Sequence, residues 1–179
     1  MKTLHKIGLL FTMLASVALG ADHCKKPHAA PVAISATIFG KFLIPADGGP
    51  AWAGHLLLKI GNGAVRVATF VDRGDGPPAM REDGTLLGTE TITVSLVDGT
   101  GSFTIKAAFE APPAATPGLF LLNEAGTISG GDGVFEGMTG HVTIKGPFVF
   151  PEEVLNPAAK LAPSLWIAQL RGRVRGIAE

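Results

Sequence analysis

The feature that most constrains the fold is a regular series of short apolar runs separated by clusters of turn residues. The runs are rich in β-branched and aromatic residues, and they span residues 32–43, 52–60, 63–72, 85–97, 101–111, 119–129, 141–149 and 164–177. Turn-forming pairs such as Gly61-Asn62 and Asp98-Gly99 lie between them. Strands at such spacing predict a sandwich or a barrel. Eight of them suit a closed antiparallel barrel with room for side chains or one small ligand.

Helices are expected to be scarce, because the chain contains 24 glycines and 13 prolines. One helical candidate spans residues 151–161. Pro151 at its start and two acidic residues in its first turn favour a helix, and Pro157 limits its length. The sequence therefore predicts an all-β barrel with one short helix before the last strand.

The first twenty residues have the pattern of a cleavable export signal. Lys2 and Lys6 provide positive charge, residues 7–19 are uncharged and too few to span a bilayer, and small residues follow around Gly20. We therefore expect a signal peptide at 1–20, a disordered leader at 21–31 and a single barrel domain at 32–179. The mature protein is expected to be periplasmic or secreted.

The composition argues against several classes of protein. Lys plus Arg and Asp plus Glu each number 15, so the formal net charge is zero and no overall positive potential would attract nucleic acid. No second apolar stretch is long enough to be an integral membrane segment. Cys24 is the single cysteine, which rules out an intramolecular disulfide. The sequence lacks four zinc ligands at suitable spacings and a phosphate-binding glycine loop, so no metal or cofactor is expected.

The glycine-rich stretch 130–142 carries a family resemblance. Its residues Gly130, Gly131, Gly133, Phe135, Gly137 and Gly140 resemble the motif of allene oxide cyclases and, more loosely, that of dirigent proteins and bacterial barrels related to both. Residues 98–105 and 173–177 resemble flanking strands of the same family. The likeness covers roughly residues 98–177. It implies a calycin-like eight-stranded barrel, often a homotrimer in the plant cyclases.

The resemblance also implies functions. In the cyclases the lumen binds an oxidised fatty acid, and in dirigent proteins it guides the coupling of phenoxy radicals. Cyclases place an acidic residue on the first barrel strand, whereas residues 32–42 contain neither an acid nor an asparagine. Cyclase activity is therefore not expected. The glycine motif itself is interpreted as structural, because glycine allows tight turns and bulges and Phe135 can reach the interior.

Three residues are candidates for catalysis. Alternation along the strand at 85–97 places Glu90 on the apolar face, where burial would raise the pKa of its carboxyl group and suit acid–base chemistry. The favoured interpretation is that a bulge or a strand end lets Glu90 reach water or an arginine. His55 and His141, which are both on expected strands, could act as bases near neutral pH.

The last strand carries a basic face formed by Arg171, Arg173 and Arg175 with Gln169. This face either points outward as a solvated stripe or lines the lumen and suits an anion. The outward orientation is favoured, because Leu170 and Val174 on the opposite face need the core.

Three functions remain open. The favoured hypothesis is a binding module that holds a small apolar or amphipathic molecule, with Phe103, Phe109, Phe135 and Trp166 as candidate contacts. The second is an isomerase or cyclase, or a dirigent-like protein, in which the lumen fixes a reactive conformer. The third is a structural or interaction protein whose barrel is filled by those same side chains together with Ile105.

Overall fold

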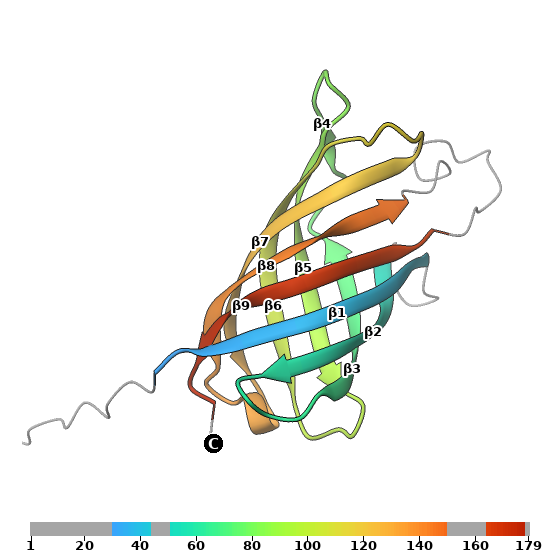
Figure 1. Ribbon diagram of the computed structural model, residues 1–179. Helices are drawn as coiled ribbons and strands as arrows, with labels where there is room; N and C mark the ends of the chain where they lie inside the picture. The colour runs from blue at the N-terminus through green and yellow to red at the C-terminus, as the bar shows by residue number, and fades with distance from the viewer. Residues whose placement is uncertain (1–29, 44–50, 150–163, 178–179) are drawn as a thin grey trace, which may run out of the picture.

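The chain folds into a closed antiparallel β-barrel. The computed structural model describes residues 30–43, 51–149 and 164–177. The strands are β1 (Val32–Leu43), β2 (Ala51–Ile60), β3 (Arg66–Gly74), β4 (Ala79–Met80), β5 (Leu86–Leu96), β6 (Ser102–Ala111), β7 (Leu119–Gly131), β8 (Thr139–Val149) and β9 (Trp166–Arg175), and the 3-10 turn η1 spans Gly133–Phe135. The sheet order is β3-β2-β1-β9-β8-β7-β6-β5-β4, and pairing of β3 with β5 closes an eight-stranded barrel (Figure 1). The predicted fold class is confirmed.

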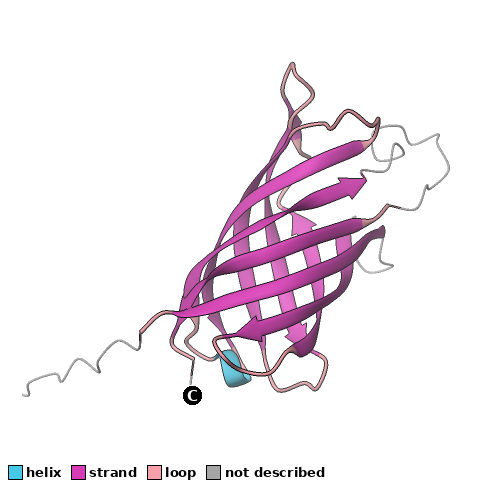
Figure 2. Ribbon diagram, in the orientation of Figure 1, coloured by secondary structure: helices cyan, strands magenta, loops and turns pink. Residues whose placement is uncertain are grey.

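Differences from the predicted strands are small and have local causes. β3 begins at Arg66 because Gly61, at φ +54°, starts a turn in which the Gly63 N–H donates to the Ile60 carbonyl. The two-residue β4 pairs with β5 inside a segment expected to be loop. Figure 2 shows that strands dominate the described chain. The predicted helix at 151–161, the signal at 1–20 and most of the leader at 21–31 lie outside the described residues.

Strict alternation along the strands puts one face of each into the barrel interior. The largest fully buried side chains, drawn from nearly every barrel strand, are those of Phe70, Phe103, Ile34, Ile38, Leu56, Leu58, Leu86, Ile92, Ile105, Ile128, Met138 and Ile144. Full burial of a side chain of this size contributes roughly 1.5–3 kcal/mol. Within the described ranges, no helix is long and apolar enough to cross a membrane.

Aromatic rings pack edge to face in one half of the interior. The ring of Trp166 lies 5.3 Å from Phe70 and 6.1 Å from Trp52, and Trp52 lies 5.6 Å from Phe148. Gly40 makes this packing possible, because a side chain there would collide with the Phe70 ring. Edge-to-face geometry adds roughly 0.5–1.5 kcal/mol per pair to the burial term.

The two ends of the barrel differ. The hairpin end carries the β2–β3 turn at 61–65, the β5–β6 turn at 97–101 and η1, and it lies at the bottom of Figure 1. The loop end carries the connection from β3 through β4 to β5 and the β6–β7 connection at 112–118, and it lies at the top. The aromatic cluster faces the loop end, because Trp52 and Trp166 begin strands that start there.

Candidate functional site

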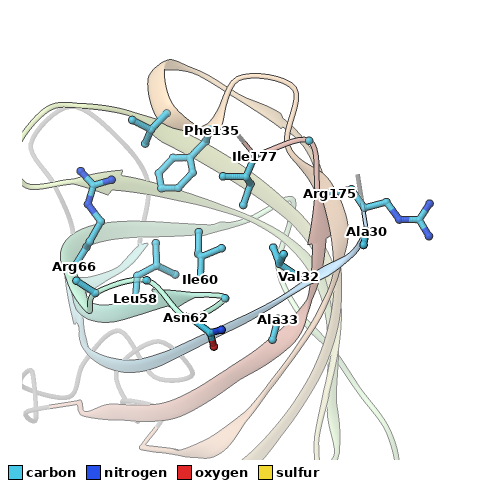
Figure 3. A pocket seen from close by; sticks show the side chains of 15 residues that line it. Ala30, Val32, Ala33, Leu58, Ile60, Asn62, Arg66, Phe135, Arg175 and Ile177 are labelled. Carbon is cyan, nitrogen blue, oxygen red and sulfur yellow. The ribbon is translucent and has the colours of Figure 1, made fainter. Parts of the chain in front are cut away.

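Side chains fill the middle of the lumen, and a hollow lies at each end. The larger one, which we call the hairpin-end opening, has a volume of about 820 Å³. Figure 3 shows Phe135 and Ile177 on one side of it and Leu58 and Ile60 on the other. Small-molecule sites are mostly apolar and have volumes of roughly 300–1,000 Å³. The opening therefore has the size and the wall chemistry of a site for a small apolar molecule.

Arg66 stands at the edge of this opening. Its Nη2 donates hydrogen bonds to the Asp98 carboxylate at 2.7 Å and to the Thr100 hydroxyl at 2.5 Å. The bond from Arg66, followed by bonds from Thr100, lowers the pKa of Asp98 to about 2. Arg175, by contrast, points away from the opening in Figure 3. The edge thus offers a guanidinium group that already has a carboxylate partner.

Three carboxylic acids lie inside the barrel towards the loop end. Asp72 on β3, Glu90 on β5 and Glu124 on β7 are only 3%, 7% and 1% exposed. Glu90 pairs in register with Ala107 on the intervening strand β6, and that small side chain leaves room for Glu90 and Glu124 to meet. Glu90 and Glu124 lie close enough for each to shift the pKa of the other.

Burial raises the pKa of each of these acids above its ordinary value. Desolvation is the main cause in each case, because the charged form of a carboxyl group is poorly solvated away from water. It raises the pKa of Glu90 to about 7 and, with the nearby charge of Glu90, raises the pKa of Glu124 to about 11. The pKa of Asp72 is also well above its ordinary value, through burial and then through Glu90 and Asp75. A carboxyl group with a pKa near 7 can accept and return protons at neutral pH.

The favoured interpretation of Glu90 from sequence was wrong. β5 pairs with β6 in unbroken register from Leu86 to Ser95, so no bulge carries Glu90 to water. The neighbours that shift the pKa of Glu90 are the acids Glu124 and Asp75, not an arginine. The strand register places Glu90 inside the barrel despite the free-energy cost of burying a carboxyl group. Protonation of the buried acids reduces that cost, because an uncharged carboxyl group is easier to bury than a carboxylate.

Two of these acids, Asp72 and Glu90, border the second hollow, which we call the loop-end cavity. It has a volume of about 40 Å³, and its walls include Trp52, Asp72, Glu90, Phe109, Phe148 and Trp166. Phe109 can lie there because its ring covers Gly88, where a side chain would collide with it. Three side chains that line the cavity each have a buried polar atom without a hydrogen-bond partner, namely Asp72 Oδ1, Glu90 Oε1 and Trp166 Nε1, and both carboxyl oxygens of Glu124 are likewise unpaired. Two predicted contact residues, Phe109 and Trp166, thus meet Glu90 at one cavity.

The other candidate residues lie elsewhere. His55 and His141 are exposed on the outer face of the barrel, away from the lumen. Arg171, Arg173 and Arg175 are exposed with Gln169, so the favoured outward orientation of the last strand is correct. In the part of the chain that the structure describes, no group of three or more histidine, cysteine or acidic residues is placed to hold a metal ion.

The glycine-rich segment shapes the hairpin end. Gly130, Gly133 and Gly137 have positive φ, and β7 carries a bulge opposite residues 103–105. The turn places the Phe135 ring 5.0 Å from that of Phe103, edge to face, inside the barrel. Asp132 accepts hydrogen bonds from the backbone N–H and the hydroxyl group of Ser102, which ties the segment to β6. Phe135 is thereby held as the floor of the hairpin-end opening.

Sequence reasoning missed Asp72, Glu124 and Trp52. The signal was available for the two acids, because the alternation that put Glu90 inside also puts Asp72 in line with Phe70, and Glu124 in line with Leu122. The hairpin-end opening had no comparable signal, since its shape depends on how two turns and a chain end meet in space.

The chain thus belongs to the class of small, closed, eight-stranded antiparallel β-barrels, and its described residues form a ligand-sized opening and a buried acidic cluster. A scan against protein-family models found no match, and searches of curated proteins and of solved structures found none either.

Proposed function

We propose that the chain is an exported binding protein that holds a small apolar or amphipathic molecule in the hairpin-end opening. The observation that carries this proposal is the size of that opening, about 820 Å³, together with its apolar walls. Burying apolar ligand surface there would contribute roughly 25 cal/mol per Å² removed from water. The signal-like segment at 1–20 supports export to the periplasm or the medium.

The walls favour a particular kind of ligand. The partly exposed side chains of Val32, Ile60 and Ile177 provide hydrocarbon contact, whereas the Arg66 guanidinium at the edge is shared with Asp98 and Thr100. A ligand with an apolar body inside and a polar end at the edge fits this distribution. An ordered side chain such as Phe135, fixed by its contact with Phe103, preorganises the site and lowers the entropic cost of binding.

Native mass spectrometry of the protein produced with its own N-terminus and recovered from the exported fraction tests this proposal. The expected spectrum shows a subunit cleaved near Gly20 and a reproducible additional mass per subunit. It also reports the number of subunits, for which the family resemblance suggests a trimer. An uncleaved chain would contradict export. Bare subunits that also fail to take up an added apolar dye would contradict binding.

A second candidate function is an isomerase or cyclase, and one specific observation favours it. Glu90 faces the interior with a pKa of about 7, next to a cavity bordered by aromatic rings. This acid is on β5, whereas the interior face of β1 carries Ile34, Ala36 and Ile38, so the arrangement differs from that of the cyclases. If Glu90 is a catalytic residue, Glu90→Gln should abolish turnover in a folded protein, and the exposed-face variant His141→Ala should not.

A further inference from the structure

The loop-end cavity combines features that a purely structural core avoids. Asp72 Oδ1, Glu90 Oε1 and Trp166 Nε1 are all buried without a hydrogen-bond partner. Leaving such an atom unpaired costs roughly 1–3 kcal/mol. The indole N–H of Trp166 is independent of the acidic cluster and can act only as a donor, so it requires an acceptor from outside the protein.

The electrostatics argue against a positively charged occupant. Burial raises the pKa of both Asp72 and Glu90 above their ordinary values, which favours the uncharged form of each carboxyl group. A protonated carboxyl group has one O–H donor and one carbonyl acceptor. A cation would need these groups to ionise in a dry environment, and the described acids are not placed around a metal position.

A hydroxyl group satisfies all of these atoms at once. It accepts hydrogen bonds from Trp166 Nε1 and from the protonated carboxyl group of one acid, and it donates one to an oxygen of the other acid. We propose that the loop-end cavity is a second binding site, which takes the uncharged hydroxyl group of a small alcohol between Trp166, Glu90 and Asp72. This site lies at the opposite end of the barrel from the hairpin-end opening and does not depend on the function proposed for that opening.

The size of the cavity agrees with this occupant. A single water needs about 10–15 Å³ when measured with a water-sized probe, and the cavity offers about 40 Å³. The volume beyond that needed for one water is bordered by the rings of Trp52, Phe109 and Phe148. A hydroxyl group with a short hydrocarbon chain therefore fits the polar atoms and also displaces water from the aromatic walls.

The two tryptophans of the chain allow a direct test. In ¹⁵N-labelled full-length protein, Trp52 and Trp166 give two indole N–H resonances, which the Trp52→Phe variant assigns. Titration with ethanol should shift the Trp166 resonance downfield and saturably. Ethylamine, which is a cation near neutral pH and has a similar shape, should leave that resonance unchanged.

Variants then separate this site from general solvent effects. By ligand-observed NMR, Trp166→Phe should weaken ethanol binding about tenfold, because one hydrogen bond of roughly 1.4 kcal/mol is lost. Leu57→Ala, at an exposed position on the outer face of β2, should bind within about twofold of the parent. A bulky substitution at the hairpin end, Ile60→Trp, should have no effect on ethanol binding.

Two results would overturn the proposal. A larger Trp166 shift with ethylamine than with ethanol would show a cation site. No saturable shift with any straight-chain alcohol from methanol to 1-butanol, in a protein with a well-dispersed spectrum, would show that water alone occupies the cavity.

Discussion

Glu90 and Glu124 interact inside the barrel and shift each other's pKa, although the strand β6 separates the strands that carry them. Ala107 on β6 is small enough to let the two side chains meet. Burial, together with the nearby charge of Glu90, raises the pKa of Glu124 to about 11 and leaves Glu90 as the member that titrates near pH 7. Two acids thus coexist in the interior, because they do not both ionise.

This pair predicts an unusual dependence of stability on pH. Glu90 and Glu124 bind protons more tightly in the folded chain, with pKa values of about 7 and about 11, than at their ordinary value of 4.5. Stability is therefore fully present below about pH 4.5 and falls as the pH rises through these folded-state values. The expected slope is about 1.4 kcal/mol per pH unit for each proton that the unfolded chain releases. Urea unfolding at a series of pH values measures it.

The variant Glu124→Gln isolates this effect. Its amide can still donate to Glu90 but carries no titratable proton, so the pH dependence should become shallower. Near pH 8 the variant should be more stable than the parent by roughly 1–3 kcal/mol. Glu110→Gln is the control, because Glu110 is exposed and pairs with Arg81, and it should change stability by less than about 1 kcal/mol. An unchanged slope in Glu124→Gln would refute the assignment.

Two glycines of the same turn provide a matched test of the hairpin end. Gly133 and Gly137 both have positive φ, but a side chain at Gly133 would collide with the Thr100 carbonyl oxygen, whereas nothing lies close to Gly137. Gly137→Ala should cost about 1–2 kcal/mol, from backbone conformation alone. Gly133→Ala should cost roughly 3 kcal/mol or more, because it also separates η1 from β6. Equal losses on chemical denaturation would contradict the packing described for η1.

The interior and exterior faces of β3 should respond very differently to truncation. Phe70 is buried against Trp166, and its neighbour Val71 faces outward and is exposed. Phe70→Ala should destabilise the protein by about 3–5 kcal/mol. Val71→Ala should change stability by about 0.5 kcal/mol or less. Differential scanning calorimetry compares the two, and a small loss for Phe70→Ala would mean that the barrel interior is not packed at this depth.

Most of the fold could be predicted because barrel strands repeat with period two. Runs such as 85–97 alternate between the core and solvent, so the pattern located their ends within a few residues and assigned their faces correctly. β4 escaped prediction because two paired residues are too few to form a pattern. The start of β3 was misplaced because Gly63 belongs to the preceding turn.

Much less of the candidate site could be predicted. Alternation identified Glu90 as an interior residue, yet the general cost of burying a carboxyl group led to the wrong preference for its surroundings. The grouping of Glu90 with Asp72 and Glu124 depends on strand order and on the small residue Ala107 between them. Such long-range juxtapositions are properties of the register, which one sequence does not specify.

The central claim is that the hairpin-end opening binds an apolar molecule, and fluorescence titration with the neutral dye Nile red tests it most directly. Ile60→Trp should fill the opening and weaken dye binding at least tenfold, which corresponds to about 1.4 kcal/mol. Leu57→Trp puts the same ring on the outer face of β2, where Leu57 is exposed, and should bind like the parent. Saturable binding that only Ile60→Trp removes is the predicted result. Absence of saturable binding in the parent, or equal binding by both variants, would contradict the claim.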